Sequence, residues 1–195
     1  MKICVSRIGN SAVAKRSRGM KIASFAAIAI AASLGVSQSV TARQSAPARP
    51  AVSDRVIAPA GLGDLRIGRP VPRGSLWRTR GAQEGGGCRT VSSPNYPGIY
   101  AMVVDGRVKR ITVGQRSNVK LASGIGVGTT ERAVRARFGR LRAEPHKYQP
   151  APAKYLNGPR TASAPSVRFE IGSDRRVSMI HVGKMPELGY VEGCA

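Results

Sequence analysis

The sequence of 195 residues is poor in acidic, aromatic, cysteine and histidine residues. Ten Asp and Glu residues stand against 32 Lys and Arg residues, so the formal net charge is +22. Neither of the two histidines belongs to an HExxH motif, and no GxSxG or GxxxxGK[ST] motif is present. These absences argue against a zinc-protease helix, a nucleophile elbow and a P-loop. We therefore expect no catalytic, cofactor-binding or metal-binding residues.

The first 42 residues are predicted to be a signal peptide. A basic stretch that ends at Lys21 precedes an uncharged, alanine-rich run over 22–36, and residues 40–42 form a small-residue cleavage site. Met20 is an alternative start to Met1. Because the run is short for a membrane span, we expect a periplasmic or secreted product with no transmembrane segment. An uncleaved anchor is the alternative.

The remaining 153 residues suit one domain. They keep a net charge of +16, because the first 42 residues contain six of the Lys and Arg residues and no acid. Residues 43–59 are rich in Pro, Ala and Ser and are predicted to be a disordered arm. Residues 60–195 are predicted to form a single domain. With only eight aromatic residues after the leader, its core must consist mainly of Val, Ile, Leu and Ala.

Two hairpins with matching patterns organise this domain, Tyr100–Val113 and Val167–Val182. In the first, Asp105-Gly106 between apolar runs predicts a type I′ turn, which needs positive φ at both central residues. The second has a longer turn over 172–175. Both returning strands carry the pattern V-x-x-I-x-V, whose three-residue step breaks the strand period of two. That step predicts a β-bulge at the same place in both hairpins.

One helix is predicted from its capping residues and its apolar stripe. It covers residues 129–139, with Thr129 or Thr130 as N-cap and with Val134 and Phe138 on the buried stripe. In the first half, residues 69–80 occupy the corresponding place, and residues 83–100 have the composition of a loop.

The predicted fold class is therefore α+β. Two tandem helix-plus-antiparallel-hairpin repeats, residues 60–120 and 121–195, should form an antiparallel sheet with helices on one face. The second repeat carries a longer connection between its helix and its hairpin, which a loop insertion explains.

Cys88 and Cys194 are the only cysteines after the leader. An exported chain meets an oxidising compartment, so we predict a disulfide between them, while a reactive thiol pair is the alternative. The bridge would close a loop of roughly 100 residues and contribute about 4–5 kcal/mol in the chain-entropy model. His146 and His181 lack a visible catalytic or metal-binding context, and His181 should face away from Ile180 and Val182.

Positive charge is the functional signal that is left. We expect a basic surface on the second strand of the first hairpin and on the helix: Arg107, Lys109, Arg110, Arg132, Arg135 and Arg137. This favours a non-enzymatic domain that binds an envelope or secreted partner through the basic surface or a sheet face. The alternatives are an anionic polymer or membrane surface, a hydrolase-type enzyme on an anionic substrate with His146 or His181 as general base, and a merely solvated surface. Nucleic acid is less accessible outside the cytoplasm.

The layout resembles the tandem repeat of the β-lactamase inhibitory protein and of the SmpA/OmlA family of small envelope lipoproteins. The residues that carry this likeness are Leu65-Arg66-Ile67-Gly68 and Ile125-Gly126-Val127-Gly128-Thr129-Thr130, with Phe138-Gly139 at the end of the second helix. The chain also resembles exported bacterial proteins that end like Tyr190-Val191-Glu192-Gly193-Cys194. The resemblance implies a concave antiparallel sheet, backed by helices, that binds proteins. No lipid-attachment cysteine and no inhibitory contact residue are matched.

Overall fold

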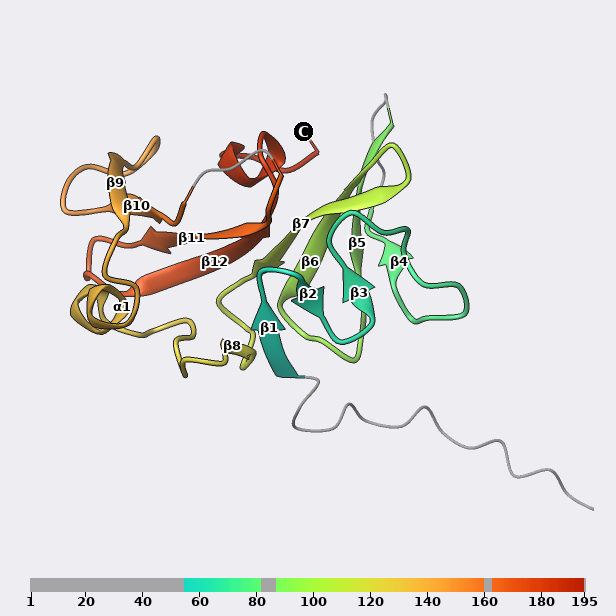
Figure 1. Ribbon diagram of the computed structural model, residues 1–195, viewed down its shortest axis with the longest axis horizontal. Coiled ribbons are helices and arrows are strands. Elements are labelled where there is room, and N and C mark those ends of the chain that lie inside the picture. The colour runs from blue at the N-terminus through green and yellow to red at the C-terminus, as the bar shows by residue number, and fades with distance from the viewer. Residues whose placement is uncertain (1–54, 82–86, 160–162, 195) are drawn as a thin grey trace, which may run out of the picture. The chain divides into compact units, whose positions relative to one another are not determined.

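The computed structural model describes residues 55–81, 87–159 and 163–194, which form two β-sheets with one short α-helix and one 3-10 helix (Figure 1). The predicted signal peptide lies outside the described residues. The predicted arm overlaps them only at residues 55–59, and there Val56–Ala58 forms a strand, β1, with Ile57 completely buried. The folded domain therefore begins earlier than the sequence indicated.

The large sheet has eight strands, and every neighbouring pair is antiparallel. In spatial order they are β4 (Arg78–Thr79), β5 (Cys88–Ser92), β6 (Ile99–Val104), β7 (Arg107–Val113), β12 (Val177–Gly183), β11 (Ser166–Ile171), β10 (Lys154–Asn157) and β9 (Arg142–Pro145). The four strands of the first half thus lie on one side and the four of the second half on the other. The halves meet where β7 pairs with β12.

Both hairpins form as predicted. Asp105 and Gly106 have φ values of 50° and 73°, as a type I′ turn requires. In β7, Val108 pairs with Val103 and Arg110 pairs with Met102, so the intervening residue has no partner across the ladder.

β12 contains the same irregularity, because Val177 pairs with Ile171 and Met179 with Glu170. The predicted bulges are therefore confirmed in both returning strands.

The two hairpins are also anchored alike. Arg107 donates from Nη1 to the carbonyl oxygen of Gly68 at 3.0 Å, and Arg176 does the same to Gly128 at 2.8 Å. The amides of these two glycines donate, at 2.7 and 2.8 Å, to the carbonyl of the valine that follows each arginine. The positions that immediately precede the arginines, Gly106 and Arg175, are therefore structural counterparts. A duplication of the sequence itself stays a prediction.

The helix α1 (Glu131–Arg137) confirms the prediction for residues 129–139. Thr130 is the N-cap, and its hydroxyl accepts a hydrogen bond from the amide of Ala133 at 3.3 Å. Val134 is completely buried, and the ring of Phe138 lies 5.2 Å from that of Phe169 in β11. One face of the short helix is thereby packed onto the large sheet.

The predicted α+β class is wrong, because the domain is mostly β. Residues 69–80 form turns and the strand β4 instead of a helix, since prolines interrupt the helical pattern and Gly74 has a φ of 72°. Residues 88–92, assigned to a loop from the sequence, form β5. Helices therefore do not cover the sheet as expected.

A small second sheet takes the place of the missing helix cover. Its strands, in order, are β3 (Leu65–Arg66), β2 (Gly61–Leu62), β1 and β8 (Lys120–Leu121). Ile57 and Leu62 from this sheet share one apolar cluster with Ile99, Ile111 and Val134. The core is aliphatic, as the scarcity of aromatic residues predicted. The opposite face of the large sheet is left for polar residues.

Candidate functional site

The face of the large sheet that points away from this core carries a chain of polar side chains, called here the polar face. Alternation along the strands and the pairing register place these residues next to one another. They are Tyr100 on β6, Arg110 and Thr112 on β7, His181 on β12, Arg168 and Glu170 on β11, and Tyr155 on β10. As the strand pattern predicted, His181 faces away from the core side of Ile180 and Val182.

Two histidines and one carboxylate meet on the polar face. His181 Nε2 lies 3.0 Å from Glu170 Oε1, and His181 Nδ1 lies 2.9 Å from the hydroxyl of Thr112. His146, from the connection after β9, reaches the other carboxylate oxygen at 3.7 Å and stacks on Tyr155 with ring centroids 4.7 Å apart. Sequence reasoning missed this cluster: the predicted hairpin over residues 167–182 contains both Glu170 and His181, but no sequence signal links His146 to them.

Each ring nitrogen of the two histidines has a polar neighbour. The amides of Tyr148 and Gln149 donate to His146 Nδ1 at 3.1 and 3.2 Å, which directs the Nε2 proton of that ring toward Glu170. His181 in the same tautomer donates from Nε2 to Glu170 and accepts the hydroxyl proton of Thr112 at Nδ1. A general base needs an unoccupied lone pair that reaches the substrate. The arrangement leaves no such lone pair on His146 or His181, the two candidate bases.

Burial and charge set the protonation of the pair. Complete burial lowers the pKa of His181, and the positive charges of Arg110 and Arg168 act in the same direction, although Glu170 opposes them. Burial alone would raise the pKa of Glu170, but its hydrogen bond from His181 and the nearby positive charges outweigh burial and lower it. The cluster is therefore built for a neutral His181 beside an ionised Glu170.

The C-terminal tail, residues 184–194, is bound to the same face by two arginines. Arg110 Nη1 donates to the carbonyls of Glu187 and Tyr190 at 3.1 and 2.6 Å, and its Nη2 donates to that of Glu192 at 3.2 Å. Arg168 Nη1 donates to the carbonyl of Gly189 at 2.5 Å. The 3-10 helix η2 (Glu187–Gly189) begins this segment.

A disulfide closes the tail. Cys88 on β5 and Cys194 are bonded with Cα atoms 5.5 Å apart, as the sequence predicted. Lys109 Nζ lies 3.6 Å from the carboxylate of Glu187 at the start of η2. The tail is thus held at both ends to the first half of the large sheet.

A second region, called here the arginine groove, is lined by residues of α1 and of the turn that joins β11 to β12. Figure 1 shows these two elements side by side. Its volume is about 520 Å³. The lining residues are Thr130, Glu131, Arg132, Arg135, Asp174, Arg175 and Arg176. The amide of Glu131 donates to the carbonyl of Arg175 at 2.9 Å, so the two walls are joined by a backbone hydrogen bond.

Two of the four arginines in the groove use their side chains for contacts within the domain, and the other two do not. Arg135 Nε lies 2.9 Å from Glu131 Oε1, and Arg176 binds a backbone carbonyl as described above. The side chains of Arg132 and Arg175 are exposed, and neither makes a hydrogen bond or ion pair with any residue in the described part of the chain. These two guanidinium groups are free to bind a ligand.

The carboxylates of the groove are also engaged. Burial raises the pKa of Glu131, but hydrogen bonds from Arg135 and Lys154 outweigh burial, and the net shift is downward. Asp174 accepts the amide of Arg176 at 3.0 Å through Oδ1. Four arginines against two carboxylates leave the groove with an excess of positive charge.

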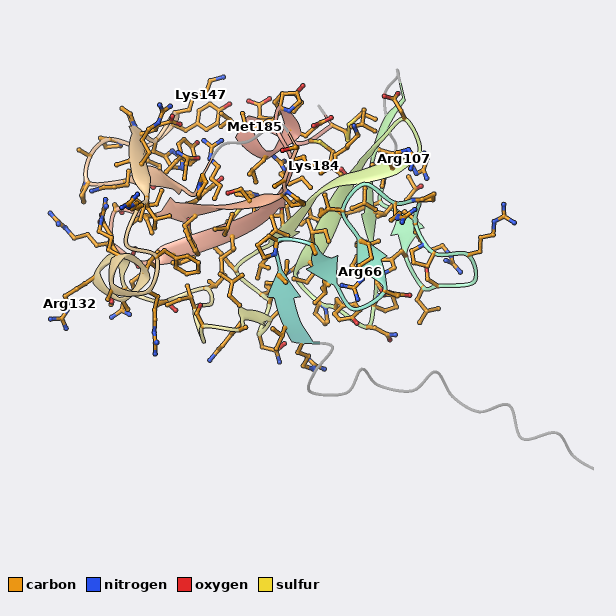
Figure 2. The ribbon with its side chains drawn as sticks, viewed as in Figure 1. Arg66, Arg107, Arg132, Lys147, Lys184 and Met185 are labelled. Atoms are coloured by element: carbon orange, nitrogen blue, oxygen red, sulfur yellow. A yellow bond between two sulfur atoms is a disulfide. The ribbon has the colours of Figure 1, made fainter. Side chains whose placement is uncertain are left out.

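The structure divides the predicted basic surface. Arg132, Arg135 and Arg137 are exposed on α1, whereas Arg107 projects from the β6–β7 hairpin at the other end of the domain (Figure 2). Arg110 is only 3% exposed, so its assignment to the surface was wrong. Arg110 lies on β7, where the C-terminal tail covers the face of the sheet opposite the core. Nothing in the sequence indicated that the tail covers this strand. Sequence reasoning also missed Arg175 and Arg176, which only the folded turn brings to α1.

No protein-family model, no curated protein and no solved structure matches this chain. The resemblance to the inhibitor and envelope-lipoprotein repeats therefore stays a prediction. Within residues 55–81, 87–159 and 163–194, no group of three His, Cys, Asp or Glu side chains is placed to hold a metal ion. In those same ranges no helix is long and apolar enough to cross a membrane.

Proposed function

We propose that this chain is an exported, non-enzymatic binding domain that recognises an acidic partner in the cell envelope or among secreted proteins. The observation that supports the proposal most directly is the unequal use of charge. Four glutamates are paired within the domain, whereas two guanidinium groups of the arginine groove have no partner in the described residues.

Four glutamates illustrate the first half of this contrast. Glu131, Glu144, Glu170 and Glu187 each lie within 4.0 Å of a Lys, Arg or His nitrogen. Their charge is compensated locally, so the excess of Lys and Arg dominates the field around the domain. A positive field attracts acidic partners and raises their rate of association.

The polar face argues against the hydrolase alternative. His146 and His181 bind the same carboxylate and keep no lone pair for a substrate, and the tail lies on the same face. The cluster fits a structural role, in which the contact between His146 and Glu170 holds the connection after β9 against β11. An activity that His146→Gln or His181→Gln abolished in a folded protein would restore the enzymatic alternative.

The test is a capture experiment on envelope and secreted extracts with the immobilised, oxidised protein at low and then at high salt. A single protein retained at high salt would support the proposal, because shape-driven contacts survive screening. If the protein retained only polymer or lipid, and only at low salt, the proposal would give way to the alternative in which the domain binds anionic polymers or membrane surfaces through its net charge. The reduced and unfolded chain is the matched control, since it has the same composition and charge without the groove.

A further inference from the structure

We propose that the arginine groove binds an acidic segment of a protein partner, with carboxylate groups held by Arg132 and Arg175. This inference rests on the proposed function and names the site and the chemistry of the partner. It follows from three features of the groove: the conformation of Arg175, the freedom of the two guanidinium groups and the mixed lining.

The first feature is the backbone of Arg175, which has a φ of 58°. Residues with a side chain rarely adopt this left-handed conformation, and a non-glycine residue there points to a local constraint. The counterpart in the first hairpin is Gly106, with a φ of 73°. The second hairpin therefore carries a long basic side chain at a position where the first carries the residue that fits the backbone best.

The fold does not require that side chain. The turn is fixed by its backbone, in which the Arg175 amide donates to the carbonyl of Gly172 at 3.0 Å and the Arg175 carbonyl accepts from Glu131. The Arg175 guanidinium adds no hydrogen bond or ion pair to any described residue. The exposed guanidinium is therefore available to a ligand.

The second feature is the placement of Arg132. It projects from α1 into solvent (Figure 2), and it lines the groove together with Arg175. One free guanidinium therefore comes from the helix and the other from the hairpin turn. Guanidinium groups bind carboxylates through two parallel hydrogen bonds, so the groove suits a ligand with two or more carboxylates.

The third feature is the presence of Thr130, Glu131 and Asp174 among the arginines. A polyphosphate chain offers only acceptors and meets repulsion from Asp174. A peptide segment offers acidic side chains to the arginines and backbone N–H donors to the carboxylate and hydroxyl oxygens. The mixed lining therefore favours an acidic protein segment over a uniform polyanion.

The test measures binding of a fluorescently labelled peptide of alternating serine and glutamate to the oxidised protein at low salt. The same peptide with glutamine in place of glutamate, inorganic polyphosphate and phosphatidylglycerol vesicles are compared. We expect the acidic peptide to bind in preference to its glutamine counterpart. Tighter binding of polyphosphate or vesicles, or no binding of the acidic peptide, would overturn the proposal.

Two double variants separate the groove from net charge. Arg132→Ser with Arg175→Gly removes the two free guanidinium groups, and we expect roughly tenfold weaker peptide binding, as two exposed ion pairs would give. Arg66→Ser with Arg116→Ser removes the same charge from exposed positions outside the groove, and we expect a much smaller change. If both double variants weakened peptide binding equally, the groove would not be the binding site, and the proposal would be overturned.

The same variants distinguish failure of this inference from failure of the proposed function. A partner captured from extract equally well by the native protein and by the groove variant would leave the binding function standing and remove the groove from it. Failure of the native protein to retain any partner would count against the proposed function itself.

Discussion

Arg110 and Arg132 were expected from the sequence to belong to one basic surface, yet they lie in opposite environments. Arg110 is buried under the tail and donates to three backbone carbonyls. Arg132 is exposed at the groove and has no partner in the described residues. The same side chain therefore stabilises the fold in one place and is available to a ligand in the other.

The difference between these regions comes from what covers them. A buried arginine needs partners within the protein, because an unpaired charge away from water is costly. Arg110 finds them through Nη1 and Nη2, while its Nε has no partner in the described residues. Burial lowers the pKa of Arg110, while neighbouring acidic groups, including Glu170 and Glu187, support its charge. An exposed arginine has water as its alternative partner, so it can exchange water for a ligand without disturbing the fold.

The largest expected effect on the buried side is loss of the disulfide. Cys88 and Cys194 are 106 residues apart, and removing a bridge of this span should lower the free energy of unfolding by about 4 kcal/mol. Urea denaturation of Cys88→Ala with Cys194→Ala, with the oxidised native protein as reference, measures the change. Peptide binding at the groove should persist wherever the variant is folded. Loss of peptide binding in a folded variant without the disulfide would show that the groove and the tail are coupled.

The next effect concerns Arg110 itself. Arg110→Met keeps the apolar stem but leaves three tail carbonyls without their charged donor, so we expect a loss of about 3 kcal/mol in the free energy of unfolding. Arg132→Met is the matched control and should change that free energy by less than about 0.5 kcal/mol. Similar losses in both variants would contradict the distinction drawn between the two arginines.

A pH effect should follow from the histidine and glutamate of the polar face. Because His181 has a lowered pKa when folded, the unfolded chain takes up its proton first, and stability should fall as the pH drops below about 6.5. Glu170, whose pKa is also lowered, should cause a second loss below its usual pKa near 4.5. Urea midpoints measured from about pH 7.5 to about pH 2.5 test this. Constant midpoints across that range would contradict the protonation states assigned here.

Local sequence patterns predicted the local structure of the domain. Asp105-Gly106 indicated the first turn, the V-x-x-I-x-V step indicated both bulges, and Thr130 marked the start of α1. Each of these signals depends on residues within a few positions, where backbone sterics and hydrogen bonding decide the conformation.

The fold class and the site depended on contacts that the sequence pattern did not show. Residues 61–66 form only two-residue strands, too short for an alternation to be visible, so the small sheet was not recognised. Arg175 lines the same groove as Arg132 only because the second turn packs against α1. No sequence pattern marks an arginine with a left-handed backbone conformation, since the turn residues that usually occupy such a position are Gly, Asn and Asp.

The smallest expected effect on the free energy of unfolding is that of Arg175→Gly. This variant separates the contribution of one side chain to binding from its contribution to stability. Arg175→Gly relieves a left-handed backbone, so we expect the free energy of unfolding to stay the same or rise by about 0.5 kcal/mol while acidic-peptide binding weakens. The matched change Gly106→Ala places a side chain at the counterpart position, where a Cβ would meet nothing within 4 Å, and should cost about 1 kcal/mol from backbone strain alone. Thermal or urea unfolding of both variants, with peptide titration, measures the contrast. If Arg175→Gly instead destabilised the domain, Arg175 would belong with Arg110 among the structural arginines, and the groove would lose the residue that distinguishes it.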